Sequence, residues 1–137
     1  MADDSPIPSS NATHETVVQA ARARDDGNEA VIGTDAAGRI LYWNERAADL
    51  YGWSVDEVLG RNVLDVTPTR RSGDAAAEIM EEMRSGSEWT GEFIVRHRDG
   101  SPMLAEVKNT VVRHGEVVVG FVGVSRPSND KPPKRAD

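Results

Sequence analysis

Side chains that commonly perform chemistry are scarce in this sequence. It contains no cysteine, which excludes disulfides, thiolate nucleophiles, cysteine-ligated zinc and iron–sulfur clusters. Its three histidines, His14, His97 and His114, fall near the N-terminal end and at two predicted turns. We expect them to be solvated residues without a role as metal or haem ligands.

Catalytic groupings are also missing from the predicted interior. No Ser-His-Asp set, phosphate-binding loop or carboxylate pair can be placed there rather than on the surface. The sequence therefore predicts a protein that is not an enzyme and that holds no metal.

Composition limits the partners of the chain. Its 137 residues, 38% of them hydrophobic, suffice for one domain with a modest core. The formal charge of −7 disfavours nucleic acid and anionic lipid as partners. Neither a basic, apolar leader nor an apolar stretch of about 20 residues occurs, so we expect no membrane contact. The lack of cysteine fits a cytoplasmic location.

Both ends of the sequence are polar and contain several prolines or serines. Residues 1–12 and 126–137 are therefore predicted to be disordered tails. A helix is expected from Thr13, which can serve as its N-cap, to Arg24, within a flanking segment of residues 13–27. The apolar side of this helix consists of Val17, Val18, Ala20 and Ala21.

Two short apolar runs follow the flanking segment. Residues 30–34 and 39–43 are separated by a segment that contains Gly38, a residue suited to a tight turn. We expect these runs to form a β-hairpin. Asn44 is then expected to cap a helix that ends at Tyr51.

The middle of the chain is predicted to be helical. Ser54 and Glu57 have the spacing of a capping box, which starts a short helix ending at Gly60. Between Ser72 and Arg84, apolar residues recur at i, i+3, i+4 and i+7, so one face of this helix must be buried. The residues of that face are Ala76, Ile79, Met80 and Met83.

Three strands are expected in the last third of the chain, at residues 88–97, 102–113 and 116–125. The pairs Asp99-Gly100 and His114-Gly115 between them suit hairpin turns. Strands and helices that are segregated in this way indicate an α+β fold, in which an antiparallel sheet is covered on one face by the helical middle section.

Several short motifs, taken in order, carry a resemblance to a known family. They are Asp35 with Gly38 at the first hairpin, Asn44 at the next helix start, Tyr51-Gly52-Trp53, and Gly60-Arg61-Asn62. Together with EWTGEFIVRHRDGSPMLAEV, they make the sequence similar to the PAS family over residues 28–125. The resemblance implies a five-stranded sheet and short helices around a small cavity that senses flavin, haem, a metabolite or a partner protein. The fold alone does not choose among these.

Residues that bind flavin in some members of this family are replaced here. In the light-sensing LOV branch, a cysteine directly follows the Gly-Arg-Asn motif and attacks the flavin, whereas this chain has Val63. FMN photochemistry of that kind is therefore excluded. Leu64 and Thr67 stand where the flavin-holding arginine and glutamine would be. The flavin-binding amides of the strands are replaced by Val95, Ala105 and Ser125.

Haem-binding members place an axial histidine on the long helix. Residues 72–84 contain no histidine, and Ala75 stands at about that position. Trp89 matches a tryptophan of FAD-binding members, which keeps an FAD sensor open as a lesser alternative. We expect no bound cofactor.

Strand alternation predicts a cavity wall that is largely apolar, with a few hydroxyls and one amide. Such a wall suits either a small uncharged, apolar ligand or a completely filled core. The predicted lining is Ile32, Thr34, Ile79, Met83, Trp89, Gly91, Phe93, Val95, Met103, Ala105, Val107, Asn109, Val119, Phe121, Gly123 and Ser125.

The opposite strand parity predicts an apolar outer face, too extensive to stay exposed. We expect the N-terminal helix to lay Val17, Val18 and Ala21 on it, and two copies to pair through the same region as a homodimer. A monomer whose helix covers its own sheet is the alternative. The strand residues of this face are Ile94, Leu104, Val112, Val118, Val122 and Val124.

The sequence after the last predicted strand departs from the family. Arg126 is followed by Pro127, Ser128 and Asn129, where members usually have an Asp-Ile-Thr-like triplet that starts a signalling helix. We expect either that the chain was cut from a longer protein with an altered end, or that it is a stand-alone sensor whose signal leaves through the N-terminal helix.

Three functional hypotheses result. The leading one is a sensory module that binds a small ligand or a partner and regulates an effector such as a histidine kinase, as the resemblance to PAS modules of bacterial sensor proteins implies. The alternative is a ligand-free module for protein interaction and homodimerisation. The third is a redox or gas sensor that uses FAD or haem.

Overall fold

A computed structural model describes residues 10–69 and 72–128. Most of the two predicted tails therefore lies outside the described residues. The described elements are α1 (Ser10–Arg24), β1 (Ala30–Asp35), β2 (Ile40–Trp43), α2 (Glu45–Tyr51), α3 (Val55–Val58), the 3-10 helix η1 (Val63–Asp65), α4 (Gly73–Arg84), β3 (Trp89–Arg96), β4 (Pro102–His114) and β5 (Val117–Pro127).

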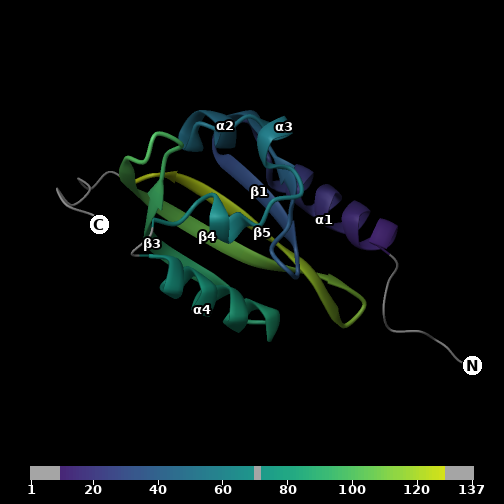
Figure 1. Cartoon of the computed structure of the whole chain (residues 1–137). Helices are drawn as coiled ribbons and strands as arrows, with labels where there is room; N and C mark the ends of the chain where they lie inside the picture. The colour runs from purple at the N-terminus through teal and green to yellow at the C-terminus, as the bar shows by residue number, and fades with distance from the viewer. Residues whose placement is uncertain (1–9, 70–71, 129–137) are drawn as a thin grey trace, which may run out of the picture.

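The strands form one antiparallel five-stranded sheet in the order β2-β1-β5-β4-β3. The predicted α+β class and the predicted hairpins are confirmed. β5 pairs with β1 and so joins the N-terminal hairpin to the three C-terminal strands. Helix α1 lies on one face of the sheet, and α2, α3 and α4 lie on the other (Figure 1).

The sheet separates two layers of apolar core. The inner layer lies under α2, α3 and η1, and its fully buried members include Ile40, Ala47, Tyr51, Val58 and Val66. The outer layer lies under α1 and consists of Val17, Ala21, Val31, Val112, Val119 and Val122. Both layers are apolar, so each contributes hydrophobic stabilisation to the same sheet.

Helix α1 begins earlier than the sequence predicts. It starts at Ser10, so Thr13 lies inside the helix and the predicted N-cap is wrong. No glycine or proline interrupts residues 10–13, and the chain therefore continues the helix towards its N-terminus. The predicted end at Arg24 is confirmed.

Strand β5 continues past its predicted end at Ser125. Pro127 pairs with Ala105, at the end of the ladder, where a residue without an N–H is tolerated. The amide of Ser128 then donates to the Leu104 carbonyl over 2.9 Å. The last described residues are thus hydrogen-bonded to the sheet.

Helix α1 packs directly on the backbone of the two central strands. A Cβ placed on Gly120 would lie 2.1 Å from the Thr34 carbonyl oxygen and 2.6 Å from Val17 Cγ2. One placed on Gly33 would lie 3.0 Å from Val17 Cγ1. Because both glycines lack a side chain, Val17 fits between them and is completely buried.

Two predicted side-chain positions are wrong because β5 contains a β-bulge. Val112 pairs with Gly120, but Arg113 pairs with Val118, so β5 has one extra residue at Val119. An extra residue reverses the alternation of side chains beyond it. Val119 therefore packs under α1 rather than in the cavity wall, and Val118 packs on the α4 side rather than on the outer face.

We expect Gly120→Ala to lower the free energy of unfolding by about 2–3 kcal/mol, because its methyl group would collide with the Thr34 carbonyl and with Val17. Gly73→Ala is the matched control, since a Cβ there meets nothing within 4 Å, and it should change stability by less than about 1 kcal/mol. Urea unfolding measures both. Equal effects of the two substitutions would contradict the close packing of α1 on the sheet.

Candidate ligand cavity

A cavity of about 120 Å³ lies between the inner face of the sheet and helix α4. The predicted lining residues surround it, with the exceptions of Gly91, Met103, Ala105 and Val119. The sheet contributes its floor from β1, β3, β4 and β5, and α4 contributes Ile79 and Met83 from the opposite side.

The exceptions have simple geometric causes. Met103 and Ala105 lie on the inner face but further along β4, where they pack in the core with Val95 instead of lining the cavity. Gly91 lies beneath the Trp89 indole, since a Cβ on Gly91 would be 3.1 Å from that ring.

Six further residues line the cavity that the sequence analysis did not assign to it. They are Tyr51, Val63, Leu64, Thr67, Ala76 and Met80. Ala76 and Met80 belong to the predicted apolar face of α4, so the helical periodicity already pointed to them. Val63, Leu64 and Thr67 come from the η1 region and stand at positions that bind flavin in some members of the family, so the family resemblance already pointed to them. Tyr51 comes from α2, and only the path of the chain between elements brings it to the sheet.

Two polar side chains in this cavity lack partners among the described residues. Thr34 is only 4% exposed, and its Oγ1 has no hydrogen-bond partner. The Asn109 side chain lies over Gly123, where a Cβ would be 2.5 Å from Asn109 Oδ1, and no described residue bonds its amide group. Buried polar groups are normally bonded, so the Thr34 hydroxyl is available to a ligand or to water, and so is the amide of the half-buried Asn109.

Two further polar side chains of the cavity, Tyr51 and Ser125, are hydrogen-bonded to each other. The Tyr51 hydroxyl and Ser125 Oγ lie 3.1 Å apart and form a buried hydrogen bond. Burial raises the pKa of Tyr51, and the hydrogen bond with Ser125 opposes this effect only in part. Tyr51 is therefore neutral at physiological pH.

The aromatic side of the cavity is formed by Trp89 and Phe93 of β3. Their ring centroids are 6.0 Å apart and the planes meet at 87°, an edge-to-face arrangement. Phe121 of β5 is buried nearby with Met80 and Met83 of α4. These side chains make the wall mostly apolar.

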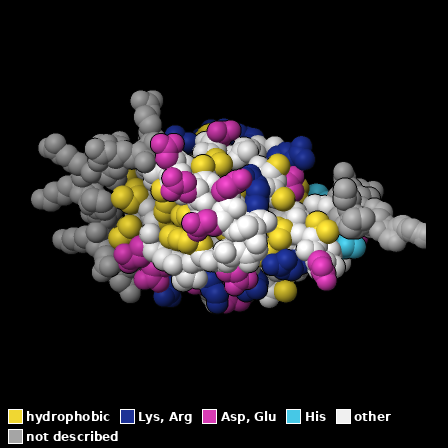
Figure 2. All heavy atoms as spheres, turned by 90° about the horizontal axis from the view of Figure 1, so that it is seen from below, with side chains coloured by type: hydrophobic (Ala, Val, Ile, Leu, Met, Phe, Trp, Pro, Cys, Tyr) yellow, Lys and Arg dark blue, Asp and Glu magenta, His cyan; other side chains and the backbone are white. Residues whose placement is uncertain are grey.

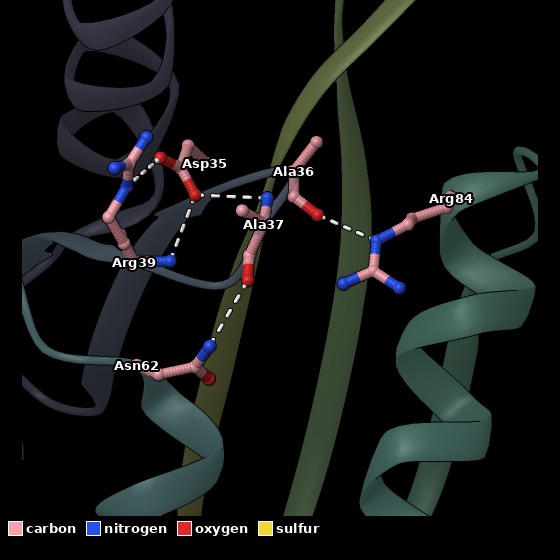
Figure 3. Close-up of polar contacts among 6 residues, drawn as sticks. All are labelled: Asp35, Ala36, Ala37, Arg39, Asn62 and Arg84. Atoms are coloured by element: carbon pink, nitrogen blue, oxygen red, sulfur yellow. Dashed lines mark hydrogen bonds and ion pairs between the residues drawn. The ribbon is translucent and has the colours of Figure 1, made fainter.

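Hydrogen bonds from α4 and from the residue before η1 hold the turn between β1 and β2 in place. Arg84 Nε donates to the Ala36 carbonyl over 2.7 Å, and Asn62 Nδ2 donates to the Ala37 carbonyl over 3.2 Å (Figure 3). Asp35 closes the same turn by accepting from the amides of Ala37 and Arg39. The C-terminal end of α4 is thereby held against the first hairpin.

The N-terminal end of α4 is fastened to β3. Ser72 Oγ donates to the Ile94 carbonyl over 3.0 Å and accepts from the Thr69 amide over 2.8 Å. Between these two fastened ends, α4 covers the cavity with Met80 and Met83, which are both buried.

The described lining of the cavity contains neither a cysteine nor a histidine. Val63, which lines it, offers no thiol, and α4 carries no histidine. His14 and His114 are exposed, and His97 lies at the β3–β4 turn, 3.3 Å from Asp99. Within the described ranges, no group of three metal-ligating side chains occurs.

A polar junction joins α1 to the sheet and to α2. Asp25, directly after α1, accepts from the Tyr42 hydroxyl over 2.6 Å and from Asn44 Nδ2 over 2.9 Å. Asn44 Oδ1 accepts from the amides of Ala47 and Val31, which confirms its predicted role as the N-cap of α2. One asparagine thus connects the flanking helix, β1 and α2.

The junction changes the acidity of its members. Burial disfavours the charged form of Asp25, but hydrogen bonds from Tyr42, Asn44 and the Gly27 amide outweigh it and lower the pKa of Asp25. Burial and the neighbouring carboxylate raise the pKa of Tyr42 to about 12. Both groups therefore keep their bonding forms across the physiological range.

The outer face is only partly covered. Val17 and Ala21 of α1 and the strand residues Val112 and Val122 are buried within one chain. Ile94 and Leu104, which lie on the outer face near the end of the sheet, stay partly accessible. Val18 of α1 and Val124 of β5 are partly accessible as well.

The surface carries mixed charge. The face seen in Figure 2 shows acidic and basic side chains interspersed among scattered hydrophobic ones. Within the described part of the chain, no helix has the length and apolar content needed to cross a membrane.

The family model of the PAS fold matches residues 8–127, which includes α1. A PAS domain from Colwellia psychrerythraea is 26% identical and covers 81% of this chain and 95% of its own length, with a TM-score of 0.69. A PAS domain from a two-component sensor histidine kinase is 21% identical, covers 81% and 95% of the two chains, and gives 0.63.

A third similar structure holds a ligand. The PAS domain of the Cronobacter turicensis quorum-sensing receptor RpfR, solved in complex with BDSF, is 20% identical and covers 74% of this chain and 95% of its own, with a TM-score of 0.61. A search of curated protein sequences finds no match.

We expect Tyr42→Phe to lower the free energy of unfolding by about 1 kcal/mol at pH 7, because Asp25 loses a hydrogen bond. Tyr42 has a raised pKa when folded, so its stabilisation is complete below about pH 10 and is lost as the pH rises towards 12. Urea unfolding of both proteins from pH 7 to 12 measures the difference. A difference that stays constant up to pH 12 would contradict this role.

Proposed function

The chain belongs to the PAS family, and from this premise we propose that it is a sensory module that binds a small molecule between the sheet and α4. The observation that carries the proposal is the unpaired Thr34 hydroxyl in a largely apolar cavity. An unpaired buried hydroxyl costs on the order of 1–3 kcal/mol, which a bound polar group recovers.

The effector that receives the signal is proposed to be a signalling protein such as a histidine kinase, and the module itself is proposed to be non-catalytic. A similar PAS domain belongs to a sensor histidine kinase, and another binds BDSF in a quorum-sensing receptor. These likenesses support a regulatory role for a fold of this kind. The cysteine-free sequence is consistent with work in the cytoplasm.

The proposed route of the signal runs across the two central strands. Thr34 faces the cavity, while its neighbour Gly33 faces Val17 of α1. Phe121 and Val122 of β5 divide in the same way between the cavity and α1. A ligand that moves the backbone at these positions therefore changes how α1 packs on the sheet.

A ligand-free interaction module is the second candidate. Ile94 and Leu104 remain partly accessible on the outer face, where a second copy could pack. An FAD or haem sensor is not proposed, because the described lining offers no histidine, no cysteine and one side-chain amide.

We expect Ala76→Phe to fill the cavity and to abolish ligand retention while the protein stays folded. Ala76 lines the cavity, whereas Ala77 on the same helix is exposed, so Ala77→Phe is the matched control. Native mass spectrometry should find a small molecule on wild type and on Ala77→Phe only. Equal retention by Ala76→Phe would place the ligand elsewhere.

For the second candidate, light scattering at high micromolar concentration measures the oligomeric state. Pairing through the uncovered outer face predicts the mass of a dimer for wild type and of a monomer for Leu104→Asp, because a buried charge opposes association. Ala77→Asp, on α4, should stay dimeric. A monomer mass for wild type would rule out the homodimer.

A further inference from the structure

Resting on the proposed function, we infer that the ligand is a neutral molecule of about the size of benzene, with a hydroxyl or amide group that hydrogen-bonds Asn109 or Thr34. The inference depends on three properties of the cavity: its volume, the charge of its lining and the position of its unpaired polar groups.

Volume limits the size of the ligand. The cavity measures about 120 Å³. A water molecule occupies roughly 30 Å³ of liquid, and an engineered apolar cavity of roughly 150 Å³ binds benzene. A single ring with a small substituent is therefore near the upper limit for a ligand that leaves the packing around it unchanged.

The lining disfavours a charged ligand. None of the described side chains around the cavity belongs to an aspartate, glutamate, lysine, arginine or histidine. An ion placed there would lose its hydration without gaining a partner of opposite charge. Trp89, Phe93 and Phe121 instead offer ring faces and edges to an apolar body.

The unpaired groups lie on the two strands that flank β5. Asn109 of β4 pairs in register with Gly123, and Thr34 of β1 pairs with Phe121, two residues before Gly123 in β5. Because Gly123 has no side chain, the Asn109 side chain extends over β5 at this point. A ligand that lies across β5 at this point meets an amide on one side and a hydroxyl on the other.

Each of these groups can both donate and accept a hydrogen bond. A hydroxyl or amide on the ligand therefore finds a partner in either orientation. A purely apolar ligand would leave Thr34 and Asn109 unpaired, which is the costlier state. Among the neutral molecules that fit, Thr34 and Asn109 thus favour those with a hydroxyl or amide group.

Phenol is a suitable probe, with benzene and benzoate as comparisons of similar size that lack the polar group or carry a charge. The chain has three tryptophans, so the indole N–H region of a nitrogen–proton NMR spectrum is simple. Phenol should shift the Trp89 signal, and its affinity should exceed that of benzene and of benzoate. The Trp43 signal, whose indole is bonded to the Trp53 carbonyl, should not move.

The variants Asn109→Leu and Thr34→Val remove the polar atoms with little change of volume. At least one of them should weaken phenol binding about fivefold, and both should leave benzene binding equal or stronger. The order of affinities in wild type tests the same inference without any variant. Benzene or benzoate binding as tightly as phenol, or unchanged phenol binding in both variants, would overturn it.

Failure of this inference differs from failure of the proposed function. If none of the three probes binds but native mass spectrometry finds another molecule that Ala76→Phe excludes, the ligand class is wrong and the sensory function stands. If no molecule of any kind occupies the cavity, both are wrong.

Discussion

The contact of Val17 with the backbone at Gly33 and Gly120 is the constraint on which the rest of the structure depends. These glycines lie on β1 and β5, the strands that connect the two halves of the sheet. With any side chain at Gly120, the strand could not approach the Thr34 carbonyl and α1 could not lie so close to the sheet. The same two strands form the floor of the cavity on their other face, so α1 and the cavity share one thin, hydrogen-bonded support.

This shared support is the physical basis of the proposed function. Close-packed interiors transmit small displacements, because neighbouring atoms have little space to absorb them. A change at Thr34 or Phe121 therefore reaches α1 through one backbone layer. The junction of Asp25, Tyr42 and Asn44 adds a polar connection between the end of α1 and the start of α2. A change in the occupancy of the cavity can thus reach α1 by two routes, the shared backbone of β1 and β5 and the polar junction at the end of α1.

Much of this fold could be predicted from sequence because its signals are local. The caps at Asn44 and Ser54, the hairpin turn with Gly38 and the helical period of α4 each depend on a few neighbouring residues. The exchange of Val118 and Val119 between faces could not be predicted, because a bulge depends on how β4 and β5 pair. The contribution of Tyr51 to the cavity depends likewise on how α2 folds back over the sheet. Ligand identity is less accessible still, because it depends on unpaired atoms that only the assembled structure defines.

The central claim is that a ligand in the cavity changes how α1 packs on the sheet. Amide hydrogen exchange of residues 17–24 tests it most directly, measured with the retained molecule present and again after its removal by unfolding and refolding. The account predicts slower exchange in α1 when the cavity is occupied, with no change in α3, which lies away from the cavity. Identical exchange in α1 in the two states would contradict it.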